Sequence, residues 1–253
     1  TYRFKLRGTN GKTIRIYPTE LLNSNSRQAQ TRWGTGTPIY DCYTFAGNAE
    51  CEEWGPRFIY HGFRYLEISG LTYEPKPEDF TAIVIRSGVE QDGTFACDHD
   101  MFNKIHGITL RAIESNLYST LTDCPHREKL GWLEVPGLLF HSLTFNYDLS
   151  AWSHKVSLDA RDAQYENVFV PNIAPEFVTF EEKMMDDPSW NGTTIMLPYR
   201  HYLKYGNIKV LHENYNAMRR LMAYYETRCV DGLLSIESLG DWGAFDGSTS
   251  VKF

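Results

Sequence analysis

Apolar and polar residues alternate one by one in the first part of the chain. Between Tyr2 and Arg7 every second residue is apolar, and the alternation returns from Thr13 to Tyr17. A period of two is typical of a strand with one buried face. Further strands are predicted between clusters of Gly, Pro and Asn, at residues 39–45, 58–68 and 81–86. The pattern predicts an all-β domain, which we place at residues 1–95.

The spacing of apolar residues changes after Phe95 to steps of three and four, which place side chains on one face of an α-helix. The first such set predicts a helix that begins at a cap formed by Asp98 or Asp100. Its members are Phe102, Ile105, Thr109, Ala112, Ile113 and Leu117. Two further helices, divided near Asn146, are predicted within residues 138–161.

The same spacing predicts two later helices, and Gly206 between them is a natural helix stop. Pro198 is placed to kink the first of them. The two apolar sets are Ile195, Tyr199, Tyr202 and Leu203, and then Leu211, Tyr215, Met218, Met222 and Tyr225. Residues 96–253 are therefore predicted to form an incomplete all-α domain.

Composition and charge narrow the range of partners. The chain has 253 residues, 42% of them hydrophobic, which is enough for a large core. Its formal net charge of −7 argues against nucleic acids and anionic membranes, because both are bound through basic surfaces. No run of about 18 apolar residues is present that could span a bilayer. We therefore expect a neutral or small partner, and the compartment stays open.

Cysteines and histidines give no sign of a metal site. The five cysteines lack C-x-x-C spacing and indicate neither a disulfide framework nor a zinc site. The histidines have no ligand spacing, so we predict surface or capping roles for His61, His99, His106, His141, His154, His201 and His212. We predict no metal and no cofactor. Trp33, Trp54 and Trp152 are predicted to pack in the interior.

The residues between Leu121 and Glu134 carry the clearest chemical signal. Pro125 prevents the preceding helix from continuing, so the segment is predicted to be a loop. It contains three carboxylates, an arginine, a histidine and a tryptophan. Carboxylates can bind sugar hydroxyls and transfer protons, and an indole ring can cover the apolar face of a pyranose. The composition fits a solvated charged turn, with Trp132 in the core, equally well.

The order of the letters favours the sugar site. The stretch Asp123-Cys-Pro-His-Arg-Glu-Lys-Leu-Gly-Trp132 resembles the signature of α-L-rhamnosidases of glycoside hydrolase family 78. Residues 54–67 resemble the last strands of that family's β-domain, and Gly240-Asp241-Trp242 resembles a later site segment. The resemblance implies a jelly-roll-like β-sandwich at residues 1–95. It also implies that residues 96–253 are the first part of an (α/α)₆ catalytic barrel.

The resemblance also assigns roles to individual residues. Glu128 would be the general acid of an inverting hydrolysis that releases terminal α-L-rhamnose. The substrate-binding residues would be Asp123, Arg127, Trp132, Glu134, Trp190, Asp241 and Trp242. The partner would be a rhamnose-containing oligosaccharide, polysaccharide or glycoside. Desolvation near Trp132 and repulsion from Asp123 or Glu134 would favour a protonated Glu128, whereas Arg127 would oppose it.

The general base of such an enzyme is expected beyond residue 253. An inverting enzyme needs a second carboxylate roughly 6.5 to 9.5 Å from the acid. The residues that follow Phe95 suffice for roughly half of the helices of a complete barrel. We therefore expect a truncated piece whose further partner is the remaining part of the same polypeptide. Two alternatives stay open: an inverting (α/α)₆ glycosidase with another sugar specificity, and a non-catalytic carbohydrate-binding homologue.

Overall fold

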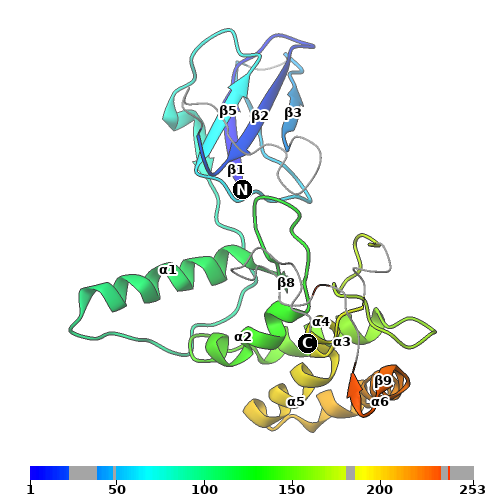
Figure 1. The fold of residues 1–253 in the computed structure, drawn as a ribbon. Coiled ribbons are helices and arrows are strands. Elements are labelled where there is room, and N and C mark those ends of the chain that lie inside the picture. Colours follow the sequence, from blue (N-terminus) through cyan, green and yellow to red (C-terminus); the bar gives the residue numbers. More distant parts are fainter. Residues whose placement is uncertain (23–38, 48–49, 181–185, 235–238, 240–253) are drawn as a thin grey trace. The chain divides into compact units, whose positions relative to one another are not determined.

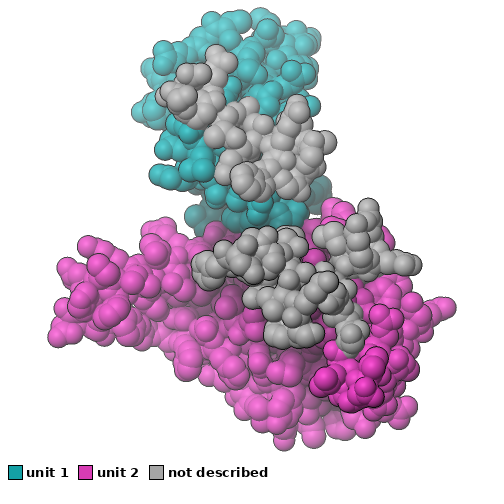
Figure 2. Space-filling model, viewed as in Figure 1, with its two compact units in different colours: residues 1–86, 124–129 teal, residues 87–123, 130–253 magenta. Residues whose placement is uncertain are grey.

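The computed structural model describes residues 1–22, 39–47, 50–180, 186–234 and 239. Two compact units can be distinguished along the chain, and Figure 2 shows each in its own colour. The strand unit contains residues 1–86 and 124–129, and the helical unit contains residues 87–123 and 130–253. The succession of a sheet-rich part and a helical part confirms the predicted fold class. The domain boundary near residue 95 stays a prediction.

The strand unit contains two antiparallel sheets of three strands each (Figure 1). One sheet has the order β4 (Glu52–Trp54), β1 (Tyr2–Leu6) and β6 (Phe80–Ala82). The other has the order β3 (Asp41–Thr44), β2 (Thr13–Thr19) and β5 (Tyr65–Ser69). A short 3₁₀ helix, η1 (Pro77–Asp79), precedes β6.

The alternating residues of β1 and β2 form the core of the strand unit. Tyr2, Phe4 and Leu6 of β1 and Ile14 and Ile16 of β2 are at most 1% exposed and lie in one cluster. Burial of one such side chain contributes about 1.5 to 3 kcal/mol. Because β1 and β2 belong to different sheets, this shared cluster joins the two sheets, and the predicted inward faces are confirmed.

The other predicted strands are shorter than expected. The segment from Phe58 to Arg64 is not a strand, and Phe58 has a positive φ of 61° with a fully exposed side chain. Ile59 is exposed as well, so the first two apolar letters of this segment do not mark buried positions. Strand β4 has no apolar alternation because two of its three residues are glutamates, and it was not predicted.

The helical unit contains six helices within the described residues and two short β-hairpins (Figure 1). Its helices are α1 (Asp100–Asn116), α2 (Glu134–Thr144), α3 (Ser150–Asp162), α4 (Pro188–Asn191), α5 (Thr193–Tyr205) and α6 (Ile208–Arg228). The hairpins are β7 (Leu117–Tyr118) with β8 (Thr120–Leu121), and β9 (Cys229–Val230) with β10 (Leu233–Leu234). The described residues of this unit form no closed barrel, in keeping with the expected incomplete one.

The predicted helix boundaries are largely confirmed. A break that includes Asn146 separates α2 from α3, and Gly206 ends α5 in the left-handed conformation with φ 67°. Pro198 lies inside α5. The predicted cap of α1 is wrong, because His99 occupies the cap position without a side-chain hydrogen bond and Asp100 is the first helical residue.

The predicted buried faces of α5 and α6 are wrong over most of their length. In α6 the buried residues are Val210, Asn214, Ala217, Leu221 and Tyr225, so only the last of the predicted set is buried. In α5 they are Thr193, Thr194, Leu197, Pro198 and His201. Small and polar side chains form a large part of the buried faces of α3, α5 and α6, which pack together. The larger apolar side chains Tyr199, Leu203, Tyr215 and Met222 are exposed.

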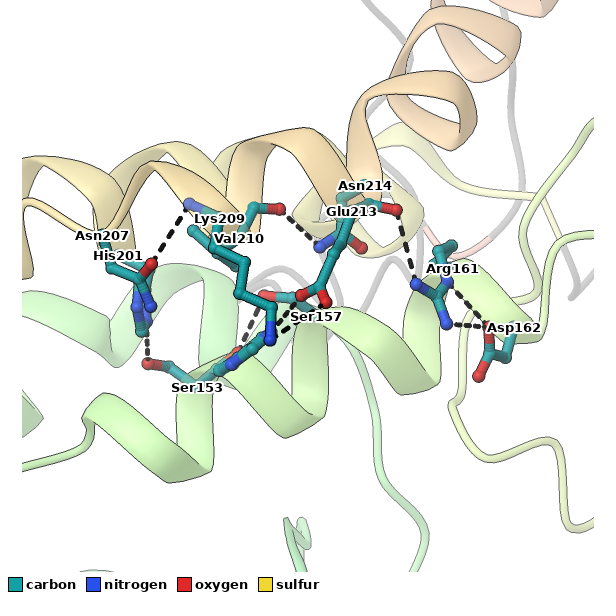
Figure 3. Close-up of polar contacts among 11 residues, drawn as sticks. Ser153, Ser157, Arg161, Asp162, His201, Asn207, Lys209, Val210, Glu213 and Asn214 are labelled. Carbon is teal, nitrogen blue, oxygen red and sulfur yellow. Dashed lines mark hydrogen bonds and ion pairs between the residues drawn. The ribbon is translucent and has the colours of Figure 1, made fainter.

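A hydrogen-bonded polar cluster connects α3 with α5 (Figure 3). The Ser153 hydroxyl donates to the Leu149 carbonyl oxygen at 2.7 Å, and His201 Nδ1 lies 2.7 Å from the same hydroxyl oxygen. Because the hydroxyl proton is used on Leu149, Nδ1 of His201 is the donor to Ser153. At the next residue of α3, His154 Nε2 lies 2.5 Å from Glu213 Oε2 of α6. Histidine thus contributes to the interior of this unit.

Two of the predicted surface histidines are therefore interior residues. His201 is 1% exposed and His61 is 4% exposed, and one ring nitrogen of each lies within 2.8 Å of a polar side chain. The packing role predicted for two tryptophans is confirmed, since Trp54 packs against the strand-unit core and Trp152 lies in the helical core. Trp33 lies outside the described residues. Among the described helices, none combines the length and apolar character needed to cross a membrane.

Candidate active site

The segment predicted to carry the catalytic acid is a tight loop. Residues 125–128 form turns between β8 and α2. No helix continues through Pro125, as expected. Residues 124–129 belong to the strand unit, whereas Asp123 and Leu130 on either side belong to the helical unit. We name residues 124–129 the acid loop.

Glu128 is partly buried and has two neighbours within the acid loop. The Cys124 thiol donates a hydrogen bond to Glu128 Oε2 at 2.8 Å, and Arg127 Nε lies 3.8 Å from the same oxygen. The Glu128 side chain is 21% exposed and that of Arg127 is 27% exposed. The sequence predicted Arg127 as a neighbour of the acid. The contact with Cys124 was not predicted, although its separation of four residues across a proline turn could have indicated it.

The state of the thiol decides what the Cys124–Glu128 pair can do. Burial, and after it the hydrogen bond and charge of Glu128, raise the pKa of the Cys124 thiol, while Arg127 acts in the opposite direction. The thiol is therefore protonated at neutral pH and acts as a donor. A metal would need the thiolate. The pair is thus suited to stabilising a negative charge on Glu128, and we propose no metal there.

The acid loop has contacts with three other residues of the strand unit. His126 Nδ1 lies 3.4 Å from Glu20 Oε2, and Lys129 Nζ lies 5.3 Å from the centre of the Tyr60 ring. The backbone N–H of Gly62 donates to the Pro125 carbonyl oxygen at 2.9 Å. These contacts could not be found from the motif, because their partners lie more than sixty residues earlier in the chain.

The helical unit contains the other described candidates. Trp132 forms a bridge with Ile173 and stacks on Phe180, with ring centres 5.3 Å apart and an interplanar angle of 19°. Glu134 is the first residue of α2, where a carboxylate interacts favourably with the helix dipole. Asp123 is exposed. Phe180 was not predicted, and nothing in its local sequence distinguishes it from a packing residue.

Trp190 lies in the short helix α4, whose first turn is capped by a side chain. Asp187 caps α4 through a hydrogen bond from the Ser189 backbone N–H at 2.9 Å, and Pro188 occupies the first turn. Asp187 also accepts from the backbone N–H of Leu239 at 2.9 Å. The Trp190 side chain is 5% exposed. Its role in substrate binding stays a prediction, and Asp241 and Trp242 lie outside the described residues.

Comparison with family models decides the family. Residues 90–252 match the model described as the bacterial alpha-L-rhamnosidase six-hairpin glycosidase domain. Residues 1–86 match the model of the bacterial alpha-L-rhamnosidase concanavalin-like domain. The chain belongs to the bacterial α-L-rhamnosidase family. The resemblance of the acid-loop motif to glycoside hydrolase family 78 is thereby confirmed.

Individual rhamnosidases are similar over nearly the whole chain. An α-L-rhamnosidase of Formosa agariphila is 32% identical over 247 residues, which is 92% of this chain and 25% of the relative. The structure of the α-L-rhamnosidase from Dictyoglumus thermophilum superposes with a TM-score of 0.84 at 33% identity, covering 95% of this chain and 27% of the other.

A second rhamnosidase structure contains the sugar. The Streptomyces avermitilis α-L-rhamnosidase complexed with L-rhamnose has a TM-score of 0.83 and 26% identity, and covers 95% of this chain and 23% of the other. The chain thus spans about a quarter of the length of the rhamnosidases that it matches. Both the strand unit and the helical unit correspond to parts of these larger proteins.

Proposed function

We propose that the protein is an α-L-rhamnosidase that removes terminal α-L-rhamnose from oligosaccharides, polysaccharides or glycosides, with inversion at the anomeric carbon. The single observation that carries the proposal is the Glu128 carboxyl group, held within the acid loop of a member of the α-L-rhamnosidase family. Membership supports the substrate class. The local geometry supports the role of Glu128.

In this proposal Glu128 protonates the glycosidic oxygen as the bond to the leaving group breaks. Both contacts within the acid loop end on Oε2, so Oε1 is the oxygen that would carry the catalytic proton. Loss of that proton leaves a carboxylate. The Arg127 guanidinium and the protonated Cys124 thiol lie where they stabilise this new negative charge, which lowers the barrier to proton transfer.

Substrate binding is assigned to carboxylates and to an aromatic ring, the two types of side chain that a sugar site requires. Asp123 and Glu134 would accept hydrogen bonds from rhamnose hydroxyls, and Trp132 would cover an apolar sugar face. The stacking of Trp132 on Phe180 supports this role, because it fixes the indole plane before the sugar binds. Inversion also requires a second carboxylate that activates water, and we assign none in this chain.

The test is hydrolysis by the natural protein that carries these residues. We expect release of rhamnose from an aryl α-L-rhamnoside, and nuclear magnetic resonance should detect the β-anomer as the first product. Glu128→Gln should lower turnover of unactivated rhamnosides by about 10²- to 10⁴-fold, with little change in rhamnose binding. Glu74→Gln, at an exposed glutamate of the strand unit, is the matched control and should leave turnover unchanged.

A panel of other aryl glycosides tests the two alternatives. Turnover of a different sugar, without rhamnose release, would replace rhamnose as the substrate and keep the glycosidase. Binding of rhamnose with no turnover of any glycoside would indicate a carbohydrate-binding homologue. Equal turnover by the wild type and by Glu128→Gln would remove the acid assignment.

A further inference from the structure

The acid loop is the only stretch after residue 86 that belongs to the strand unit within the described residues (Figure 2). The chain enters it from β8 and leaves it for α2, both elements of the helical unit. A loop that is grouped with a different unit from its flanking elements is held mainly by contacts outside its own sequence neighbourhood. Those contacts determine where Glu128 lies.

One short segment of the strand unit contacts the acid loop at both ends. At the first end, the Gly62 N–H donates to the Pro125 carbonyl oxygen at 2.9 Å. At the last end, the Lys129 ammonium group lies over the Tyr60 ring at 5.3 Å, a favourable cation–π distance. Glu128 lies between these two attachment points in the sequence. The segment 60–62 therefore holds both ends of the acid loop in place.

The fit at Gly62 leaves no room for a side chain. A Cβ atom at this position would lie 2.8 Å from Cγ and 2.9 Å from Cβ of Pro125. Real Cβ contacts are not that short, so a methyl group would displace the proline ring and the turn that follows it. Gly62 has no positive φ, so alanine itself suits the backbone there. A substitution would thus act on the acid loop and not on the local fold.

The segment 60–62 is itself held in place by buried polar contacts. His61 Nε2 lies 2.8 Å from Asp41 Oδ2, and the Tyr2 hydroxyl donates to the same oxygen at 2.6 Å. Burial opposes ionisation of Asp41, but the hydrogen bonds from His61 and Tyr2 outweigh it and hold the pKa of Asp41 below its usual value. The resulting carboxylate also attracts Lys129. The core strand β1 is thereby connected to the acid loop.

Lys129 is an unusual residue in its position. Its φ of 55° is a left-handed conformation that L-residues other than glycine, asparagine and aspartate seldom adopt, and it directly follows Glu128. Burial lowers the pKa of its ammonium group, while the nearby Asp41 carboxylate acts in the opposite direction. Strained and desolvated residues persist where surrounding contacts hold them, and they are concentrated at functional sites. Here those contacts are Tyr60 and Asp41.

We propose that Gly62 and Lys129 are positioning residues, through which the strand unit holds the Glu128 carboxyl group at the place where it can protonate the leaving group. This inference rests on the proposed function, because it concerns the acid that the proposed function assigns. Neither residue is a catalytic residue, and neither needs to touch the sugar. A general acid must come within about 2.6 to 3.2 Å of the oxygen that it protonates. A displacement of about 1 Å lowers the rate by about 10²-fold.

The experiment compares two rhamnosides that differ in their need for a proton. A 2,4-dinitrophenyl α-L-rhamnoside has a leaving group that departs without protonation, whereas a rhamnosyl disaccharide requires the acid. In the natural protein, Gly62→Ala and Lys129→Met should lower kcat on the disaccharide at least tenfold. We expect less than threefold loss on the dinitrophenyl substrate and little change in KM. Lys129→Arg retains the cation and should recover most of the disaccharide activity.

Controls separate a positioning role from a general loss of structure. Gly88→Ala adds a methyl group where no atom lies within 4 Å, and Lys5→Met removes an exposed cation from the strand unit. Both controls should turn over the two substrates like the wild type. If Gly62→Ala does not fold, the comparison of Lys129→Met with Lys129→Arg carries the test. Thermal unfolding of each variant shows which of them are folded.

Each outcome decides between the positioning role and the proposed function. Selective loss on the disaccharide in Glu128→Gln, Gly62→Ala and Lys129→Met supports both. Selective loss in Glu128→Gln alone, with the other two variants unchanged or equally slow on both substrates, rejects the positioning role and keeps the proposed function. If Glu128→Gln itself is not selective, then the acid assignment fails, and the positioning role fails with it.

Discussion

At the scale of single residues, the Glu128 carboxyl group has two contacts within the acid loop, one with a thiol and one with a guanidinium group. Glu128 and Arg127 were predicted as neighbours from the letters of the motif, and the structure places them 3.8 Å apart. Cys124 was not predicted as their partner, because the four-residue spacing brings it to Glu128 only where the backbone turns. Its thiol contact depends on the turn at Pro125, which is a property of the backbone.

Asp123 offers a test of the proposed substrate-binding residues. Its side chain is exposed, so an exchange to asparagine should leave stability almost unchanged. We expect Asp123→Asn to raise KM for an aryl α-L-rhamnoside and to lower kcat by about tenfold, because an amide accepts hydrogen bonds more weakly than a carboxylate. Steady-state kinetics would measure both effects. Asp98→Asn, at another exposed aspartate, should change neither.

An unchanged KM and kcat for Asp123→Asn would mean that this carboxylate does not face the sugar. The Glu128 assignment would stand, because the two residues have separate roles. Asp241 and Trp242 lie outside the described residues, and their assignment rests on the resemblance alone.

At the scale of elements, the positions of helices and strands were predicted better than their faces. Periodicity gave β1, β2, α1, α3, α5 and α6 with boundaries close to those observed. It failed for the buried faces of α5 and α6, because periodicity is recognised from large apolar side chains. The buried faces of these helices instead include small and polar residues such as Thr194 and Asn214. Hydrogen bonds that satisfy such residues cannot be read from one segment alone.

His201 makes the polar packing of α3 and α5 sensitive to pH. Burial, followed by the charge of His154, lowers the pKa of His201 below its ordinary value of 6.5, and Asp148 opposes them only in part. The unfolded chain therefore binds a proton at His201 more readily than the folded chain does. The contribution of the neutral His201 to stability is complete above pH 6.5 and is lost as the pH falls from there through the folded-state pKa.

The prediction for this histidine concerns the slope of stability against pH. His201→Asn retains a donor for Ser153 and removes the titrating ring, so it should lower stability at neutral pH but flatten the decline on the acid side. Thermal unfolding between about pH 5 and pH 8 would measure this slope. His99→Asn, at an exposed histidine, is the control. An identical slope in the wild type and in His201→Asn would contradict the prediction.

At the scale of the whole molecule, the sheet-rich part and the helical part followed from the change of period near residue 95. The membership of the acid loop in the strand unit did not, because it depends on contacts such as that between Gly62 and Pro125 across a long stretch of sequence. Sequence patterns report what an element buries along its own length. They do not report which distant segment a loop contacts.

A core substitution in the strand unit should therefore affect catalysis. Phe4 is 1% exposed and contacts the rings of Tyr43, Trp54 and Phe80, so Phe4→Ala should destabilise this unit by about 3 to 5 kcal/mol. We expect activity on a rhamnosyl disaccharide to be lost at a lower temperature than the helical signal in circular dichroism. Val84→Ala, at an exposed valine of the same unit, should change neither.

Simultaneous loss of disaccharide activity and helical signal in Phe4→Ala would show that the two units unfold as one. Retention of activity beyond the unfolding of the strand unit would contradict the positioning role of that unit.

The course of the chain through residues 124–129 limits how these proteins can be recombined. Consider a chimera that takes residues 1–86 from one homologue and the rest of the chain from another. Its Tyr60 and Gly62 would contact an acid loop that comes from a different protein. Exchange of the strand unit between homologues thus requires two grafts, residues 1–86 and residues 124–129. In evolution, substitutions at residues 60–62 and 124–129 should have been inherited together.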